Sequence, residues 1–132
     1  MARATEPDKR SFIRISQTLQ VRYKFVSSTK KDKALTQSYS GDTRNISGSG
    51  ILLVGKLPDP AWVEELLGKR MSLAVSIRLP GVGGPVNAVA RAAWINVDME
   101  KKPIECEMGL EFREITQVDE QRLLEFIIAS LI

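Results

Sequence analysis

Two arginines four residues apart stand near the start of the chain. Arg10 and Arg14 are separated by a short segment that contains Phe12 and Ile13. A guanidinium fork pairs bidentately with phosphate oxygens and also matches the O6/N7 edge of guanine. Lys9 adds a further cation directly before the first arginine. This short segment could therefore hold a base and a phosphate of the same ligand.

A polar, glycine-bracketed turn follows about thirty residues later. It contains Asn45, Ser47 and Gly50 and runs directly into the apolar segment 51–54. The Asn45 amide can meet the donor edge of guanine, the Ser47 hydroxyl can bond phosphate or base, and Gly50 lets a ligand approach the backbone. Arg44 adds a cation beside the turn. We expect the two stretches to meet around one anionic guanine nucleotide.

The composition excludes several kinds of site. The chain of 132 residues has no histidine, which removes the commonest general base, the usual metal ligand and the Ser–His and Cys–His nucleophile pairs. The single Cys106 cannot form an internal disulfide, and the net charge of +3 falls short of the dense basic face typical of duplex binding. No apolar run approaches the ~18 residues that a membrane span needs. We expect a cytoplasmic binding domain with no catalytic residue, metal, cofactor, membrane or nucleic-acid polymer.

The hydrophobic pattern predicts mainly strands. Six stretches show the alternation or the β-branched content of strands: 19–25, 34–43, 51–54, 71–79, 86–97 and 104–113. In the last of them, Glu105, Glu107 and Glu111 alternate with apolar residues, and we interpret them as a solvated face. Antiparallel strands in this number manage their edges by closing into a barrel.

Two helices are predicted from the signals at their ends. Asp59 can cap a short helix with Pro60 at its first position, and Gly68 can end it. Thr116 begins a capping box ahead of a helix that reaches the last residue. The second helix carries an apolar stripe, interpreted as core or a dimer contact, that consists of Leu123, Leu124, Ile127, Ile128 and Leu131.

We therefore expect a mainly β fold. It is a six-stranded antiparallel β-barrel with a short internal helix and a C-terminal α-helix. Residues 1–8 are expected to be a flexible N-terminal tail, because they carry mixed charge and little apolar content. Residues 9–132 are expected to form a single domain.

The two polar stretches together resemble the PilZ domain family. Its pattern is Arg-x-x-x-Arg followed by Asp/Asn-x-Ser-x-x-Gly, and every position is matched by Arg10, Arg14, Asn45, Ser47 and Gly50. The segment 108–112 before the last helix is similar to the last strand of the family. Ala93 and Trp94 fall where many members have a small residue and a tryptophan.

The resemblance implies a barrel that binds cyclic di-GMP as a receptor and not as a catalyst. It places Arg10 and Arg14 on guanine and phosphate, with Asn45, Ser47 and Gly50 as the barrel-side surface. Asn45 stands where aspartate is commoner, and Lys9 stands where some members carry arginine, which leaves open whether one ligand or a stacked pair binds. Lys9, Arg44 and Trp94 are secondary candidates, and for Trp94 core packing is favoured over stacking on a base.

Two other functions remain open from the sequence. A PilZ-like barrel could serve as a protein-interaction adaptor that needs no nucleotide. A binder of single-stranded nucleic acid would need several exposed aromatics on one sheet face, and the pattern does not cluster them. In the favoured interpretation, residues 9–14 become ordered when cyclic di-GMP binds and pass the signal to a downstream protein. A monomer and a homodimer are both compatible with the sequence.

Overall fold

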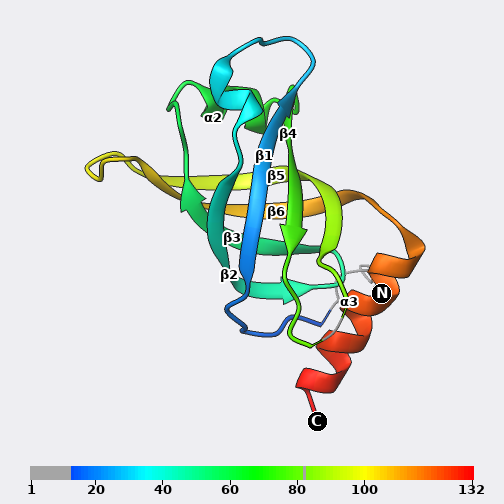
Figure 1. Cartoon of the computed structure of the whole chain (residues 1–132). Helices are drawn as coiled ribbons and strands as arrows, with labels where there is room; N and C mark the ends of the chain where they lie inside the picture. Colours follow the sequence, from blue (N-terminus) through cyan, green and yellow to red (C-terminus); the bar gives the residue numbers. More distant parts are fainter. Residues whose placement is uncertain (1–12, 82) are drawn as a thin grey trace, which may run out of the picture.

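The computed structural model describes residues 13–81 and 83–132, which form a closed antiparallel barrel (Figure 1). The strand order is β1-β2-β3-β6-β5-β4. The strands are β1 (Gln20–Ser27), β2 (Tyr39–Ser47), β3 (Gly50–Lys56), β4 (Met71–Ile77), β5 (Val86–Asp98) and β6 (Glu105–Ile115). The helices are the 3₁₀ helix η1 (Lys33–Thr36), α2 (Trp62–Leu67) and α3 (Gln117–Ser130). The predicted barrel with a short internal helix and a C-terminal helix is confirmed, whereas the predicted tail 1–8 lies outside the described residues.

The alternation in the sequence becomes the inside and outside of the barrel. In β1, Val21, Tyr23 and Phe25 are buried while the residues between them are exposed. The short helix α2 covers one end of the barrel, where Trp62 packs against Phe25 with ring centroids 5.1 Å apart. Burial of such aromatic surface is a main source of stability for a domain of this size.

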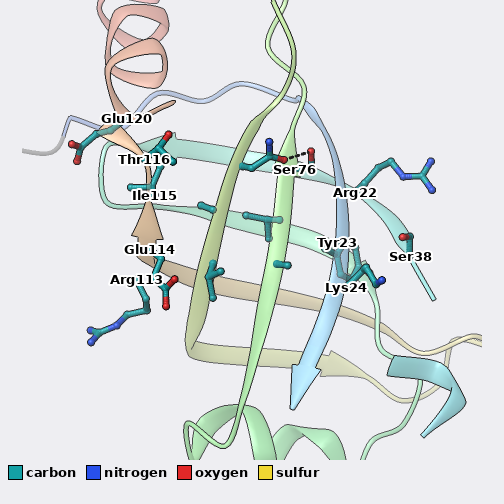
Figure 2. Close-up of a pocket in the computed structure, with 15 residues that line it drawn as sticks. Arg22, Tyr23, Lys24, Ser38, Ser76, Arg113, Glu114, Ile115, Thr116 and Glu120 are labelled. Carbon is teal, nitrogen blue, oxygen red and sulfur yellow. Dashed lines mark hydrogen bonds between the residues drawn. The ribbon is translucent and has the colours of Figure 1, made fainter. Parts of the chain in front are cut away.

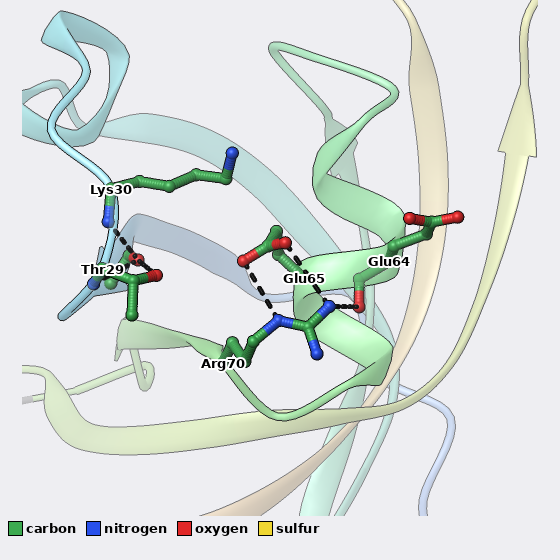
Figure 3. Close-up of polar contacts among 6 residues, drawn as sticks. Thr29, Lys30, Glu64, Glu65 and Arg70 are labelled. Atoms are coloured by element: carbon green, nitrogen blue, oxygen red, sulfur yellow. Dashed lines mark hydrogen bonds and ion pairs between the residues drawn. The ribbon is translucent and has the colours of Figure 1, made fainter.

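The turn from α2 into β4 is held by charged side chains. Arg70 Nε lies 3.4 Å from Glu65 Oε1, and its Nη2 donates to the carbonyl oxygen of Glu64 at 3.4 Å (Figure 3). Lys69 takes a positive φ of 63° in this turn, and its Nζ donates to the carbonyl oxygen of Ala92 at 2.6 Å. These bonds join the α2 turn to β5, the strand that carries one wall of the site described below.

Two predicted elements differ from the structure. Residues 34–36 of the predicted strand 34–43 belong to η1, because the Asp32 side chain accepts the Ala34 N–H at 3.0 Å and starts a helical turn, and β2 begins only at Tyr39. The internal helix begins at Trp62 and not at Pro60, because Asp59 caps the preceding turn by accepting the Ala61 N–H at 2.9 Å.

The C-terminal helix begins as predicted but buries less than predicted. The Thr116 hydroxyl accepts the Asp119 N–H at 3.1 Å, which confirms the N-terminal cap. Leu123 and Ile127 are buried, whereas Ile128 is 56% exposed and Leu131 is 54% exposed. Figure 1 shows the helix leaving the end of β6 and running past one end of the barrel, so the stripe is not core along its whole length. The alternative, a dimer contact, stays a prediction for Ile128 and Leu131. None of the described helices combines the length and the apolar character that crossing a membrane requires.

Cys106 is expected to be inert in the folded protein. Its side chain is buried on β6, and burial raises the pKa of the thiol to about 11. The thiolate is the reactive form, so a disulfide reagent such as DTNB at pH 8 should react only after unfolding. The raised pKa also stabilises the fold below the ordinary thiol pKa, and this contribution is lost as the pH rises through about 11. Equal reaction rates with and without urea would contradict this placement.

Candidate functional site

The segment 15–19 before β1 runs along β2 and is hydrogen-bonded to it; we call this segment the Ile15 strap. Ile15 and Ile46 exchange two backbone hydrogen bonds, with N–O distances of 2.9 and 3.0 Å. Thr43 bonds both backbone groups of Leu19, since its N–H donates to the carbonyl oxygen at 2.9 Å and its hydroxyl accepts the N–H at 2.9 Å. The path of the chain between 15 and 19 is therefore fixed against the barrel wall, and the residue before Ile15 is placed with it.

A bulge in β2 turns the motif residues toward the outer surface. Thr43 pairs with Leu53 and Asn45 pairs with Leu52, so Arg44 is the extra residue. A bulge of this kind changes which side chains face inward. After it, Ile46 is fully buried in the core, and Asn45 and Ser47 share the other side of the strand.

A cavity of about 650 Å³ lies over this side of the barrel. It combines Arg14, next to the Ile15 strap, with residues from β2, β3, β5 and β6, among them Asn45, Ser47, Gly50, Trp94 and Glu111. The structure thus brings Arg14 next to the three residues predicted from the turn. In the part of the chain that the structure describes, the two polar stretches therefore meet at this cavity.

The pairing of residues across neighbouring strands arranges the residues that line the cavity in two rows. Each row passes from β2 over β3 to β6, and the first continues to β5. The first row is Asn45, Leu52, Gly109 and Trp94, and the second is Ser47, Gly50 and Glu111. Each row contains a glycine that packs too closely for a side chain, since Gly109 lies under the Trp94 indole and Gly50 lies against the Leu110 carbonyl oxygen.

The Trp94 side chain packs over Gly109, the glycine of the first row. A Cβ at Gly109 would overlap the indole Nε1, so the ring lies directly over the backbone of β6. The side chain is 44% exposed and lines the cavity, and the expectation that Trp94 packs in the core is wrong. An indole held flat and open to solvent offers a surface on which a base can stack.

Ser47 and Gly50 close the turn between β2 and β3. The Ser47 hydroxyl accepts the Ser49 N–H at 3.2 Å and lies 3.1 Å from the Ser49 hydroxyl. A Cβ at Gly50 would overlap the carbonyl oxygen of Leu110, so only glycine permits this approach of β3 to β6. Both residues therefore shape the floor of the cavity whether or not a ligand is present.

Comparison with known proteins identifies the family of this chain. The model of the PilZ domain matches residues 8–129. The chain belongs to the PilZ domain family. No curated protein gave a significant match.

Solved PilZ-containing and related structures share the fold. The inhibitor of motility MotI/DgrA of Bacillus subtilis is 24% identical, with a TM-score of 0.62 over 99% of this chain and 52% of its own. The PilZ domain of YcgR from Escherichia coli, solved with c-di-GMP, is 18% identical, with a TM-score of 0.59 over 94% of this chain and 92% of its own. MrkH, described as a c-di-GMP-dependent transcription regulatory factor, is 14% identical, with a TM-score of 0.62 over 89% and 49%. The chain spans about half the length of MotI and MrkH, with 52% and 49% of those chains covered.

The remaining predicted site residues fall outside the cavity of this PilZ domain or outside the described residues. Arg44 points elsewhere, since its Nη1 lies 2.8 Å from Glu107 Oε2 on β6. Lys9 and Arg10 lie outside the described residues, so their part in the site stays a prediction. Glu111 is exposed, as predicted, and it also lines the cavity, which the sequence did not indicate because alternation places it on the outer face without showing which strands flank it. No group of three or more His, Cys, Asp or Glu in the described part of the chain could hold a metal ion.

A larger hollow lies on the outer surface of β1, β4 and β5, with a volume of about 950 Å³ (Figure 2). Arg22 and Lys24 stand on one side of it, and Glu114 and Glu120 stand on the other. Its charges are mixed, and it contains none of the residues that the PilZ motifs supply. We therefore place the candidate site of this PilZ domain in the cavity beside Arg14.

Proposed function

We propose that this chain is a receptor that binds cyclic di-GMP in the cavity beside Arg14. The observation that carries the proposal is the backbone pairing of Ile15 with Ile46, because it places Arg14 at the rim of the cavity that Asn45 and Ser47 line. Membership of the PilZ family supports it, and so does the c-di-GMP complex of the YcgR PilZ domain, which shares the fold.

Each residue has a role that its chemistry permits. The Arg14 guanidinium pairs with a phosphate or with the O6/N7 edge of guanine. Trp94 stacks on a base, and Asn45 offers an amide to the edge of the ring. Lys9 and Arg10 are proposed to add cations from the preceding segment. Gly50 lets β3 approach β6 closely at the floor of the cavity.

These contacts are sufficient for a useful affinity. A micromolar complex requires about −8 kcal/mol. Hydrogen bonds to charged groups contribute about 1.5–3 kcal/mol each, and stacking of a base on an aromatic ring contributes about 1–3 kcal/mol. Four or five such contacts reach this value after the cost of ordering the segment 9–14.

The signal is proposed to pass through the segment 9–14. Arg14 adjoins the Ile15 strap, so a ligand held by Arg14 and Arg10 would fix the path of the residues before it on the barrel surface. A downstream protein would then recognise the rearranged surface. Amide hydrogen exchange over residues 3–16 should show added protection with cyclic di-GMP, and unchanged exchange rates would contradict this part of the proposal.

Calorimetric titration tests the receptor function directly. Cyclic di-GMP should give saturable heat, and the fitted site number will distinguish one ligand from a stacked pair. Cyclic di-AMP serves as the control of equal charge. Absence of heat at high micromolar cyclic di-GMP would reject the receptor and favour an adaptor that binds its protein partner without nucleotide.

Replacement of Trp94 by alanine is expected to weaken binding. Loss of one stacking partner removes about 1–3 kcal/mol, which is about 5- to 150-fold in affinity. Trp94→Phe keeps a ring in the same place and should retain most of the affinity. The two variants should unfold at similar urea concentrations, because the exposed indole adds little to the core. Equal affinity of Trp94→Ala and the unmodified protein would exclude stacking at this site.

A further inference from the structure

One carboxylate stands in the proposed anion site. Glu111 is the acidic side chain among the described residues that line the cavity. It lies on β6 opposite Gly50, which itself pairs with Ser47 of β2. Neighbouring strands are about 4.8 Å apart, so Glu111 stands about 10 Å across the floor from the β2 side. Arg14 enters the cavity from that β2 side, next to the Ile15 strap.

Two of the other three acids of β6, Glu105 and Glu107, have cationic partners, whereas Glu114 lies outside the cavity and has none among the described residues. Glu105 contacts Lys56 at 3.5 Å and Lys101 at 3.2 Å, and Glu107 contacts Arg44 at 2.8 Å. Within the described residues, Glu111 forms no such ion pair, even though β5 places Arg91 opposite it in the register. Its side chain is exposed and lines the cavity, so a ligand in the cavity can reach the carboxylate.

A carboxylate in a site for a doubly charged phosphate ligand is unfavourable unless it meets hydrogen-bond donors. The Watson–Crick edge of guanine presents two adjacent donors, N1–H and the N2 amino group, and an ionised carboxylate accepts both. The Hoogsteen edge of guanine presents the acceptors O6 and N7, which suit a guanidinium. Adenine presents the acceptor N1 toward the carboxylate instead, and this arrangement is repulsive.

We propose that Glu111 is the residue that selects guanine in this cavity. In this arrangement the base lies between the β2 and β6 sides of the cavity, with the Arg14 guanidinium at its acceptor edge and the Glu111 carboxylate at its donor edge. Asn45 is a neutral amide, so Glu111 supplies the negative charge that the motif residues of this chain lack. The inference rests on the proposed binding of cyclic di-GMP and names the origin of its base selectivity.

The test compares three cyclic dinucleotides with the unmodified protein and with Glu111→Gln. Cyclic di-IMP has hypoxanthine bases, which keep N1–H and O6 but lack the 2-amino group. The unmodified protein should bind cyclic di-GMP about tenfold or more tightly than cyclic di-IMP, because one arm of a bidentate contact is lost. In Glu111→Gln, affinity for cyclic di-GMP should fall about tenfold or more, and the preference over cyclic di-IMP and cyclic di-AMP should shrink to a few-fold.

Glu107→Gln is the matched control. It makes the same chemical change on the same strand, outside the cavity, and should keep both the affinity and the preference of the unmodified protein. A Glu111→Gln variant that binds cyclic di-GMP with its preference intact would overturn the inference while leaving the receptor function standing. Equal loss for all three ligands would also overturn it, since that pattern indicates a general effect on the site. Failure of the unmodified protein to bind any of them would reject the receptor function itself, and this inference with it.

Discussion

Arg14→Ala should lower the affinity for cyclic di-GMP by about 5- to 150-fold while the fold is retained. A bidentate arginine contact to a base or a hydrogen bond to a charged group is worth about 1–3 kcal/mol. The Arg14 side chain is exposed, and no ion pair joins it to another described residue. Its removal should therefore leave the far-ultraviolet circular dichroism and the urea midpoint unchanged. Calorimetric titration measures the loss of affinity.

Two variants separate contact from charge. Arg44→Ala also removes one positive charge, but the Arg44 guanidinium pairs with Glu107 outside the cavity. This variant should therefore keep an affinity within about twofold of the unmodified protein. Arg14→Lys keeps the charge and loses the planar fork, so its affinity should lie between those of the alanine variant and the unmodified protein. If Arg14→Ala and Arg44→Ala bind alike, the cavity is not the site.

Gly50→Ala should destabilise the barrel by about 3 kcal/mol, near the upper end of the usual cost of overpacking. The added methyl group would overlap the carbonyl oxygen of Leu110, which is backbone and cannot rotate away. Relief requires β3 to move from β6, and these strands pair over seven residues from Gly50 to Lys56. Urea unfolding followed by circular dichroism measures the change in the free energy of unfolding.

Gly84→Ala is the control for this prediction. A Cβ at Gly84 has no neighbour within 4 Å, so the change should be close to neutral. An unchanged midpoint for Gly50→Ala would show that β3 and β6 are not held as closely as described. Because the expected cost lies in the fold, loss of ligand binding in Gly50→Ala would say nothing about contact between this residue and the ligand.

Much of the fold was predictable because alternation decides which side of a strand enters a barrel. The pattern of Val21, Tyr23 and Phe25 is reproduced in the core, and the Thr116 cap is where the sequence places it. The 3₁₀ helix η1 was missed because Leu35 and Tyr39 also fit the outline of a weak strand. A short turn is decided there by one local bond from Asp32, which leaves no periodic signal.

The lining of the candidate cavity was predictable in part. The motif residues Arg14, Asn45 and Ser47 were identified from their spacing, and the structure brings them to one cavity. Glu111 and the exposed position of Trp94 depend on register across strands that are distant in sequence. Periodicity shows which face of a strand is buried, but it does not show which strand lies beside it.

The two tryptophans differ in solvent exposure, so the fluorescence of the chain can report on the cavity. Trp62 of α2 is buried at one end of the barrel, and Trp94 is partly exposed and lines the cavity. A change in intrinsic emission on addition of a ligand can thus be traced to one indole, and its assignment follows from a spectrum of Trp94→Phe. Occupancy of the pocket can be followed in real time without a dye, a tag or an added chromophore.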